Sequence, residues 1–126
     1  SNDPLTAAAI AMTMVEMAPD HPLTKHISVA YWKGGDDAVE EMLYQPDNIA
    51  RINAFLSLIK PLAESKNVTL AQLVIRWTID RPGITVALVG ARNAAQAIQN
   101  AKAIDIKLAP EEIDFINKHL NALTLV

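Results

Sequence analysis

Apolar residues between positions 47 and 65 recur at intervals of three and four. The repeating positions are Ile49, Ile52, Phe55, Leu56, Ile59 and Leu62. This spacing places them on one stripe of an α-helix, so the pattern predicts an amphipathic helix over Asp47–Ser65. Because proline lacks an amide hydrogen, we expect a bend at Pro61, which lies inside this helix.

A second stripe of apolar residues follows Thr69 and ends at Pro82-Gly83. It consists of Leu70, Leu73, Val74 and Trp77. Thr69 and Gln72 have the spacing of a capping box, in which each side chain bonds the backbone amide of the other residue. The proline-glycine pair stops a helix. The pattern therefore predicts a helix that Thr69 caps and that ends before Pro82.

The run Ile84–Val89 is continuously apolar, which is typical of a strand buried on both faces. Two further helices are predicted, over Asn93–Ala103 and over Pro110–Leu123. Proline is favourable in the first turn of a helix, which supports the second of these starts. From residue 46 onward, the predicted order is helix, helix, strand, helix, helix.

The first third of the chain has a different pattern. Leu5–Met17 is rich in alanine and methionine and apolar nearly all round, which predicts a buried helix. Ile27–Trp32 is rich in β-branched and aromatic residues and predicts a short strand. Gly34-Gly35 breaks it, and an aspartate after the break can cap a short helix through Tyr44. The change of pattern suggests two segments, residues 1–45 and 46–126.

The totals narrow the class of protein. Of the 126 residues, 51% are hydrophobic and 20% are charged, which is typical of a globular chain. A net charge of −3 argues against a nucleic-acid partner. The most apolar stretch, Thr6–Ala18, is shorter than a membrane span and lacks a basic start, so we expect no membrane partner and a cytoplasmic location. Without cysteine, disulfides and thiolate metal sites are excluded.

Four consecutive pieces of the chain resemble the end of an aldo-keto reductase. In order, they are similar to the helix before the eighth barrel strand, that strand with its following loop, the short helix behind it, and the start of the final helix. The pieces are Asn67–Thr78, Ile84–Asn93, Ala94–Ala101 and Leu108–Ile113. The resemblance covers residues 46–126, and residues 1–45 do not share it. It implies an α-rich α/β fold, the C-terminal portion of a (β/α)8 barrel, with mostly helices and one or two short strands.

The resemblance also implies a cofactor site, because this family binds NADP at the C-terminal ends of its strands. The residues that match its binding segment are Gly90, Ala91, Arg92, Gln96, Gln99 and Asn100. The resemblance implies that Gly90 lets the backbone approach a phosphate and that Arg92 pairs with the adenosine 2′-phosphate. The amides that open the following helix favour an anion. Gln96 and Asn100 are four residues apart and share a helix face, and Gln99 stands where some members have glutamate.

Each of these residues also has a purely structural interpretation. Asn93 and Gln96 fit a capping box, Arg92 fits a solvated surface arginine, and Gly90 fits the exit of a strand. Two other patterns are weaker. Thr69–Leu73 with the following turn fits a DNA-binding helix-turn-helix only superficially, since no basic patch accompanies it. Asp20, His21 and His26 form a poor metal pattern, so no metal site is expected.

The family's chemistry uses a tyrosine, a lysine, an aspartate and usually a histidine from earlier strands. No segment here resembles those motifs, and the residues of matching type lie in other surroundings: Tyr31, Tyr44, Lys25, His21 and His26. We therefore assign no catalytic residue. The resemblance therefore implies a fragment that anchors the cofactor of an NADP-dependent carbonyl reductase and is inactive alone. The alternative is a helical structural or protein-interaction module without a cofactor, for which Met12, Met14 and Met17 offer an adaptable surface.

The predicted strand raises the question of partners. One or two strands cannot close a sheet, so Ile84–Val89 is expected to leave backbone groups unpaired. Helices that would cover a barrel are expected to expose apolar faces. We therefore expect a homo-oligomer or association through those helix faces, with Leu5–Met17 covering part of the exposed core.

Overall fold

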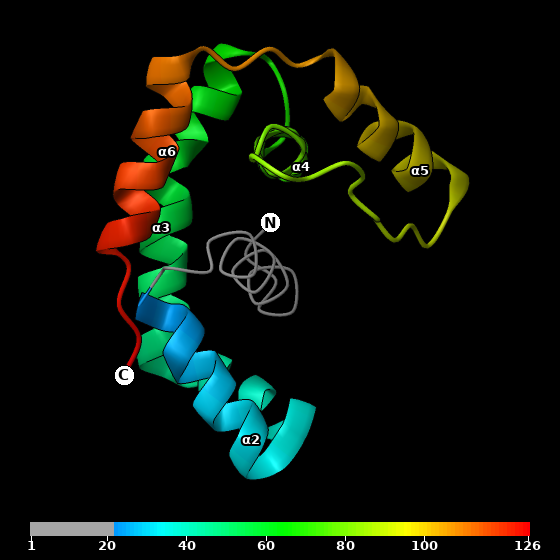
Figure 1. Cartoon of the computed structure of the whole chain (residues 1–126). Coiled ribbons are helices and arrows are strands. Elements are labelled where there is room, and N and C mark those ends of the chain that lie inside the picture. Colours follow the sequence, from blue (N-terminus) through cyan, green and yellow to red (C-terminus); the bar gives the residue numbers. More distant parts are fainter. Residues whose placement is uncertain (1–21) are drawn as a thin grey trace.

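The structure is a computed structural model, and it describes residues 22–126. The described elements are α2 (Pro22–Leu43), α3 (Pro46–Ser65), α4 (Leu70–Ile79), α5 (Ala94–Ala101), the 3-10 helix η1 (Lys102–Asp105) and α6 (Pro110–Ala122). In Figure 1, α3 and α6 run side by side, and α4 is seen nearly end-on between them and α5. The predicted helix Leu5–Met17 lies outside the described residues.

The core forms where α3, α4 and α6 meet. The α3 stripe buries Ile52, Phe55 and Ile59, and α4 adds Leu73 and Trp77. The other buried residues of this core are Val39, Leu43, Leu56, Ala63, Val74, Ile116, Leu120, Leu123 and Leu125. The apolar positions that predicted α3 and α4 are thus largely the positions that fill the core. The helix of α3 continues through Pro61.

Asn48 is a buried polar residue that joins distant parts of the chain. Its amide nitrogen donates to the Met42 carbonyl at 2.7 Å and to the Val126 carbonyl at 3.1 Å. The Val126 amide donates back to its side-chain oxygen at 2.8 Å. The side chain therefore fastens the C-terminal residue against the junction of α2 and α3, and it is buried with its hydrogen bonds made.

The prediction of a strand over Ile27–Trp32 is wrong, because these residues lie within α2. Strand propensity chiefly measures how well a side chain packs on a sheet, and no described segment offers these residues a sheet. The predicted break is confirmed. Gly34 (φ −155°, ψ 15°) and Gly35 (φ 68°, ψ −154°) depart from helical geometry and divide α2 in two. Glycine suits the positive φ at Gly35 because it has no Cβ.

The prediction of a strand over Ile84–Val89 is also not confirmed. No strand occurs in the part of the chain that the structure describes, although this segment is extended rather than helical. A strand needs a neighbouring strand to complete its hydrogen bonds, and the described chain supplies none. Of the elements that the resemblance implies, the described chain therefore shows the helices and no strand. None of the described helices is both long and apolar enough to cross a membrane.

Candidate functional site

The loop that leaves the extended segment turns directly into α5. Asn93 has an extended backbone (φ −155°, ψ 170°) and caps the helix, with its side-chain oxygen accepting from the Gln96 amide at 2.9 Å. The predicted Asn93 cap is thus confirmed. The other half of the predicted capping box differs, because the Gln96 side-chain oxygen accepts from the amide of Arg92 at 2.8 Å. This bond folds the loop back over the first turn of α5.

Gln96 and Asn100 face the same loop, as their four-residue spacing predicts. The Asn100 side-chain nitrogen donates to the Gly90 carbonyl at 3.2 Å, one turn of helix beyond the contact of Gln96 with Arg92. Together the two side chains fix the path of Gly90–Arg92 along α5. Each keeps one polar atom for another partner, because Gln96 uses only its oxygen here and Asn100 only its nitrogen.

Arg92 is the cation of this loop. It is exposed, and its guanidinium has no hydrogen bond or ion pair among the described residues. The amides of Ala94 and Ala95, in the first turn of α5, likewise have no acceptor in the described part of the chain. Arg92 precedes the first turn of α5 by two residues, and an exposed cation in the loop that leads into unpaired helix amides favours an anion, since both supply hydrogen-bond donors and positive charge.

Gln99 is bonded to α4 rather than to the loop. Its backbone carbonyl and its side-chain oxygen both accept from the Gln72 side chain of α4, at 2.8 and 3.0 Å. Gln72 is buried, at 6% exposure, and its own side-chain oxygen accepts from the Thr69 amide at 3.0 Å. The predicted capping box of α4 is therefore confirmed. Gln72 of this capping box also binds Gln99 of α5, a contact that the sequence pattern did not predict.

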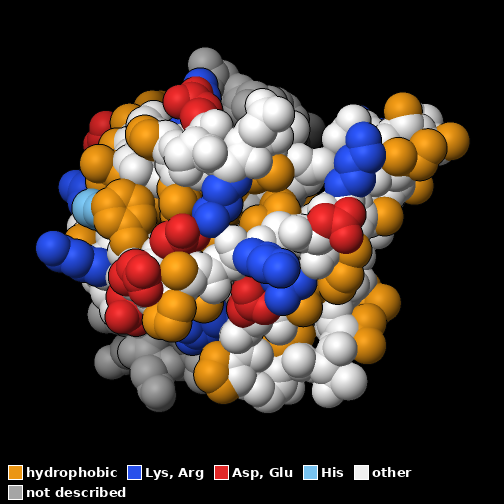
Figure 2. Space-filling model, turned by 90° about the horizontal axis from the view of Figure 1, so that it is seen from above, with side chains coloured by type: hydrophobic (Ala, Val, Ile, Leu, Met, Phe, Trp, Pro, Cys, Tyr) orange, Lys and Arg blue, Asp and Glu red, His pale blue; other side chains and the backbone are white. Residues whose placement is uncertain are grey.

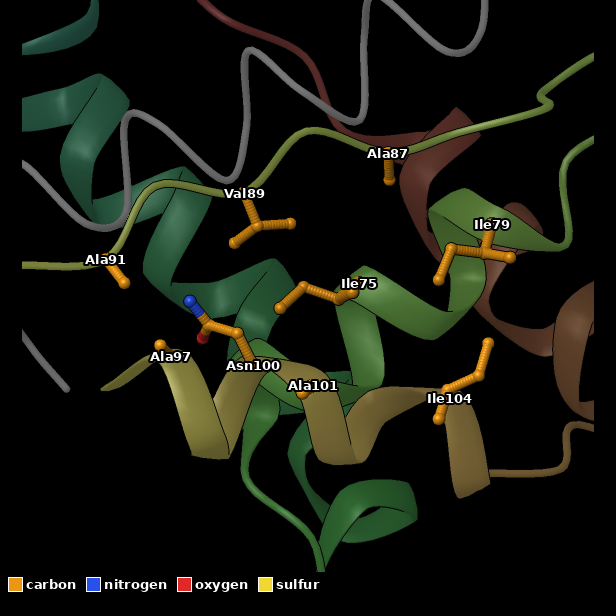
Figure 3. A pocket seen from close by; sticks show the side chains of 9 residues that line it. All are labelled: Ile75, Ile79, Ala87, Val89, Ala91, Ala97, Asn100, Ala101 and Ile104. Carbon is orange, nitrogen blue, oxygen red and sulfur yellow. The ribbon is translucent and has the colours of Figure 1, made fainter. Parts of the chain in front are cut away.

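A cavity of about 350 Å³ lies between α4, α5 and the extended segment. Figure 3 shows Val89 and Ala87 directed toward Ile75 of α4, with Asn100 between the loop and α5. The complete lining is Ile75, Ile79, Ala87, Val89, Ala91, Ala97, Asn100, Ala101 and Ile104. The side chains that line it are apolar except for the Asn100 amide, so the space can take a flat or aliphatic group with a polar atom at its loop end.

The residues weighed as catalytic or metal-binding do not form a cluster that the structure can show. Asp20 and His21 lie outside the described residues. Tyr44, the residue after α2, is partly buried and packs against the helical core. In the described part of the chain, no three His, Cys, Asp or Glu side chains come together as metal ligands would.

Comparison with known proteins gives one family and several partial relatives. A model of the aldo/keto reductase family matches residues 19–121, and so begins inside the segment for which the residues alone showed no resemblance. A probable voltage-gated potassium channel subunit beta of Oryza sativa subsp. japonica is 35% identical over 72 residues, which are 56% of this chain and 21% of that protein. A long-chain acyl-protein thioester reductase of Vibrio harveyi is 39% identical over 51 residues, 39% of this chain and 11% of that protein.

A third relative is an uncharacterized oxidoreductase of Mycobacterium bovis. It is 32% identical over 72 residues, which are 57% of this chain and 22% of that protein. The chain thus spans between about a tenth and a fifth of the length of these relatives.

Proposed function

Since this chain belongs to the aldo/keto reductase family, we propose that it supplies the anchor for the adenosine 2′-phosphate of NADP in a carbonyl-reducing enzyme. The observation that carries the proposal is the exposed Arg92 side chain, which has no partner among the described residues and precedes by two residues the first-turn amides of α5 that have no acceptor there. The names of two partial relatives, a thioester reductase and an oxidoreductase, support reduction as the chemistry of the whole protein.

We assign each residue a role from the polar atoms that make no hydrogen bond within the described chain. Arg92 pairs with the 2′-phosphate, because a planar guanidinium can donate two parallel hydrogen bonds to it. The amides of Ala94 and Ala95 add donors at the positive end of α5. The Gln96 nitrogen and the Asn100 oxygen, which the loop does not use, contact the ribose and the adenine. Gln99 is the least available of the six candidates, because Gln72 occupies it.

The chemistry itself belongs to other parts of the enzyme. When bound, NADPH supplies the hydride that reduces a carbonyl carbon. This chain binds and orients the far end of the cofactor, and we assign none of its residues to proton transfer. We therefore propose that the chain alone has no reductase activity. We further propose that the protein is cytoplasmic.

Gly90 provides a test that separates binding from folding. A Cβ built at Gly90 meets nothing within 4 Å, so the protein's own packing does not require glycine there. We expect Gly90→Ala to change the free energy of unfolding by less than about 0.5 kcal/mol, as for other surface changes. The same variant is expected to weaken binding of 2′-phospho-AMP several-fold, since the methyl group enters the space where a phosphate approaches the loop. Unchanged binding in calorimetric titration would contradict the role given to Gly90.

A second candidate function is self-association, and the segment Ile84–Val89 favours it. Within the described chain, no backbone hydrogen bond joins residues 85–89 to another residue. Val86 is 70% exposed and Leu88 95% exposed. No charged residue lies between Arg81 and Arg92. Figure 2 shows hydrophobic side chains gathered along the arm on the right, where Figure 1 places α5 and the segment before it. An extended, uncharged, apolar edge is a template for another strand.

The second copy of this chain fits that edge. In an antiparallel pair centred on Ala87, Val86 of one copy lies opposite Leu88 of the other, and both exposed side chains fall on one face. The opposite face, with Ala87 and Val89, stays against the helices (Figure 3). Packing against helices gives a two-stranded ribbon the support that it lacks alone.

The absence of cysteine allows a direct test of this pairing. We expect a mixture of Val86→Cys and Leu88→Cys chains to form the mixed disulfide faster than either variant forms its own, because only the mixed pair is directly opposite. Sedimentation should show dimers that increase with concentration. A monomer at every concentration, or equal cross-linking in all three samples, would exclude this mode of association.

A further inference from the structure

The hold of α4 on α5 is polar rather than apolar. Helix α5 has no buried residue, and the cavity separates part of it from Ile75 and Ile79 of α4 (Figure 3). Hydrophobic packing holds the turn after α5, where Ala103 of η1 is buried, but it does little to fix α5 itself. The position of the loop and of the first turn of α5 therefore depends mainly on the hydrogen bonds between α4 and α5.

Gln72 makes the first of these connections. Its side-chain nitrogen donates to the backbone carbonyl and the side-chain oxygen of Gln99. Gln99 lies in the last turn of α5, where carbonyl oxygens are available to partners outside the helix. At the same time, the Gln72 side-chain oxygen is held by the Thr69 amide. Both ends of the Gln72 amide are thus committed, which fixes its orientation in a position that is only 6% exposed.

Arg76 makes the second connection, one helical turn further along α4. Its guanidinium donates to the Ile104 carbonyl at 3.0 Å. Two more of its nitrogens donate to the Asp80 carboxylate, at 2.7 and 3.1 Å. This forked pair holds the guanidinium plane, so that its remaining donor points at η1. Gln72 and Arg76 share one face of α4 and hold α5–η1 at points five residues apart.

We infer that Gln72 and Arg76 are positioning residues for the site that Arg92, Gln96 and Asn100 form on α5. They contact no ligand themselves. They hold the C-terminal half of α5 on α4, and α5 in turn carries the loop through the contacts of Gln96 with Arg92 and of Asn100 with Gly90. This inference rests on the proposed function only for the identity of the ligand, because the attachment of α5 can be measured without one.

A pair of variants isolates the attachment from the stability of α4. Gln72→Met and Thr69→Val each remove one of the two bonds of the capping box. Only Gln72→Met also breaks the bonds to Gln99. We expect amide hydrogens of residues 97–101 to exchange about tenfold faster in Gln72→Met than in Thr69→Val, because only the former loses the two partly buried hydrogen bonds to Gln99. Amides of α3 should exchange alike in both, which would show that the core remains folded.

Arg76→Lys is the second variant, since lysine keeps the charge but cannot pair with Asp80 and reach Ile104 at once. It should also speed exchange in residues 97–101. In titrations, both Gln72→Met and Arg76→Lys should reduce the preference for 2′-phospho-AMP over AMP, while Thr69→Val keeps it.

The outcomes separate the two ideas. If the unaltered chain shows no preference for 2′-phospho-AMP, the proposed function fails, and the exchange data alone judge the attachment. If Gln72→Met and Arg76→Lys leave exchange in residues 97–101 as it is in Thr69→Val, the inference is overturned whatever the ligand does. It is also overturned if exchange rises but the preference for the 2′-phosphate is fully kept.

Discussion

Replacing Arg92 by alanine is expected to remove the preference for 2′-phospho-AMP over AMP, lowering affinity for the former roughly tenfold or more. The physical reason is that the guanidinium has no partner among the described residues, so its charge is available to an incoming dianion. AMP, which lacks the 2′-phosphate, should bind the variant and the unaltered chain alike. Isothermal titration with both nucleotides measures the difference.

Two controls make the Arg92 result specific. Lys102→Ala removes an exposed positive charge at the C-terminal end of α5 and should leave the preference intact, because that end of a helix leaves carbonyl oxygens rather than amides unpaired. Arg92→Lys should keep part of the affinity, since a lysine offers charge without the planar fork. If Lys102→Ala and Arg92→Ala weaken binding equally, general electrostatic attraction explains the effect and Arg92 has no special role.

Trp77→Ala should cause the largest loss of stability, about 3–5 kcal/mol in the free energy of unfolding. The indole is 1% exposed in the core between α4 and α6. Its nitrogen donates to the Asn117 side-chain oxygen at 2.9 Å, and the Arg81 guanidinium lies 5.0 Å from the ring centroid. Truncation therefore leaves a cavity and removes the donor to Asn117. Urea denaturation followed by circular dichroism measures the change.

The chain contains a matched control, because its other tryptophan is exposed. Trp32 is 87% exposed, so Trp32→Ala should change the free energy of unfolding by less than about 0.5 kcal/mol. Trp77→Phe should lie between the two, since it keeps most of the apolar volume but loses the hydrogen bond to Asn117. Equal stability of Trp77→Ala and Trp32→Ala would contradict the packing of α4 against α6.

Helix positions could be predicted wherever one chain segment carries its own signals. The apolar stripe of α3 predicted Asp47–Ser65, and the helix spans Pro46–Ser65. For α5 the prediction over Asn93–Ala103 ran too far, because its last turn tightens into η1 from Lys102. Helix caps and apolar stripes depend only on nearby residues, so they can be recognised in a chain that spans only part of its relatives' length.

The two strand predictions were not confirmed because a strand, unlike a helix, depends on a neighbouring segment and not on its own residues alone. Ile27–Trp32 and Ile84–Val89 have strand-like residues, but a strand exists only through pairing with a neighbour. In the described chain the first segment is helical, and the second is extended without backbone partners. The residue types of a segment determine whether it could pair as a strand, and the presence of a neighbouring strand determines whether it does.

In the candidate site too, features set by nearby residues were predicted and contacts between distant residues were not. The four-residue spacing of Gln96 and Asn100 predicted their common face, which the bonds to Arg92 and Gly90 now show. The bond from Gln72 to Gln99 joins residues 27 positions apart, and that from Asn48 to Val126 joins residues 78 apart. No local pattern marks such pairs, so sequence reasoning gave Gln72 only its capping role and gave Asn48 none.

The most direct test of the central claim is a titration of the unaltered chain with 2′-phospho-AMP and with AMP, followed by amide chemical shifts. The claim predicts tighter binding of 2′-phospho-AMP, with the largest shifts at Arg92, Ala94 and Ala95. Equal or absent binding of the two nucleotides, or shifts confined to other parts of the chain, would contradict a 2′-phosphate anchor on α5.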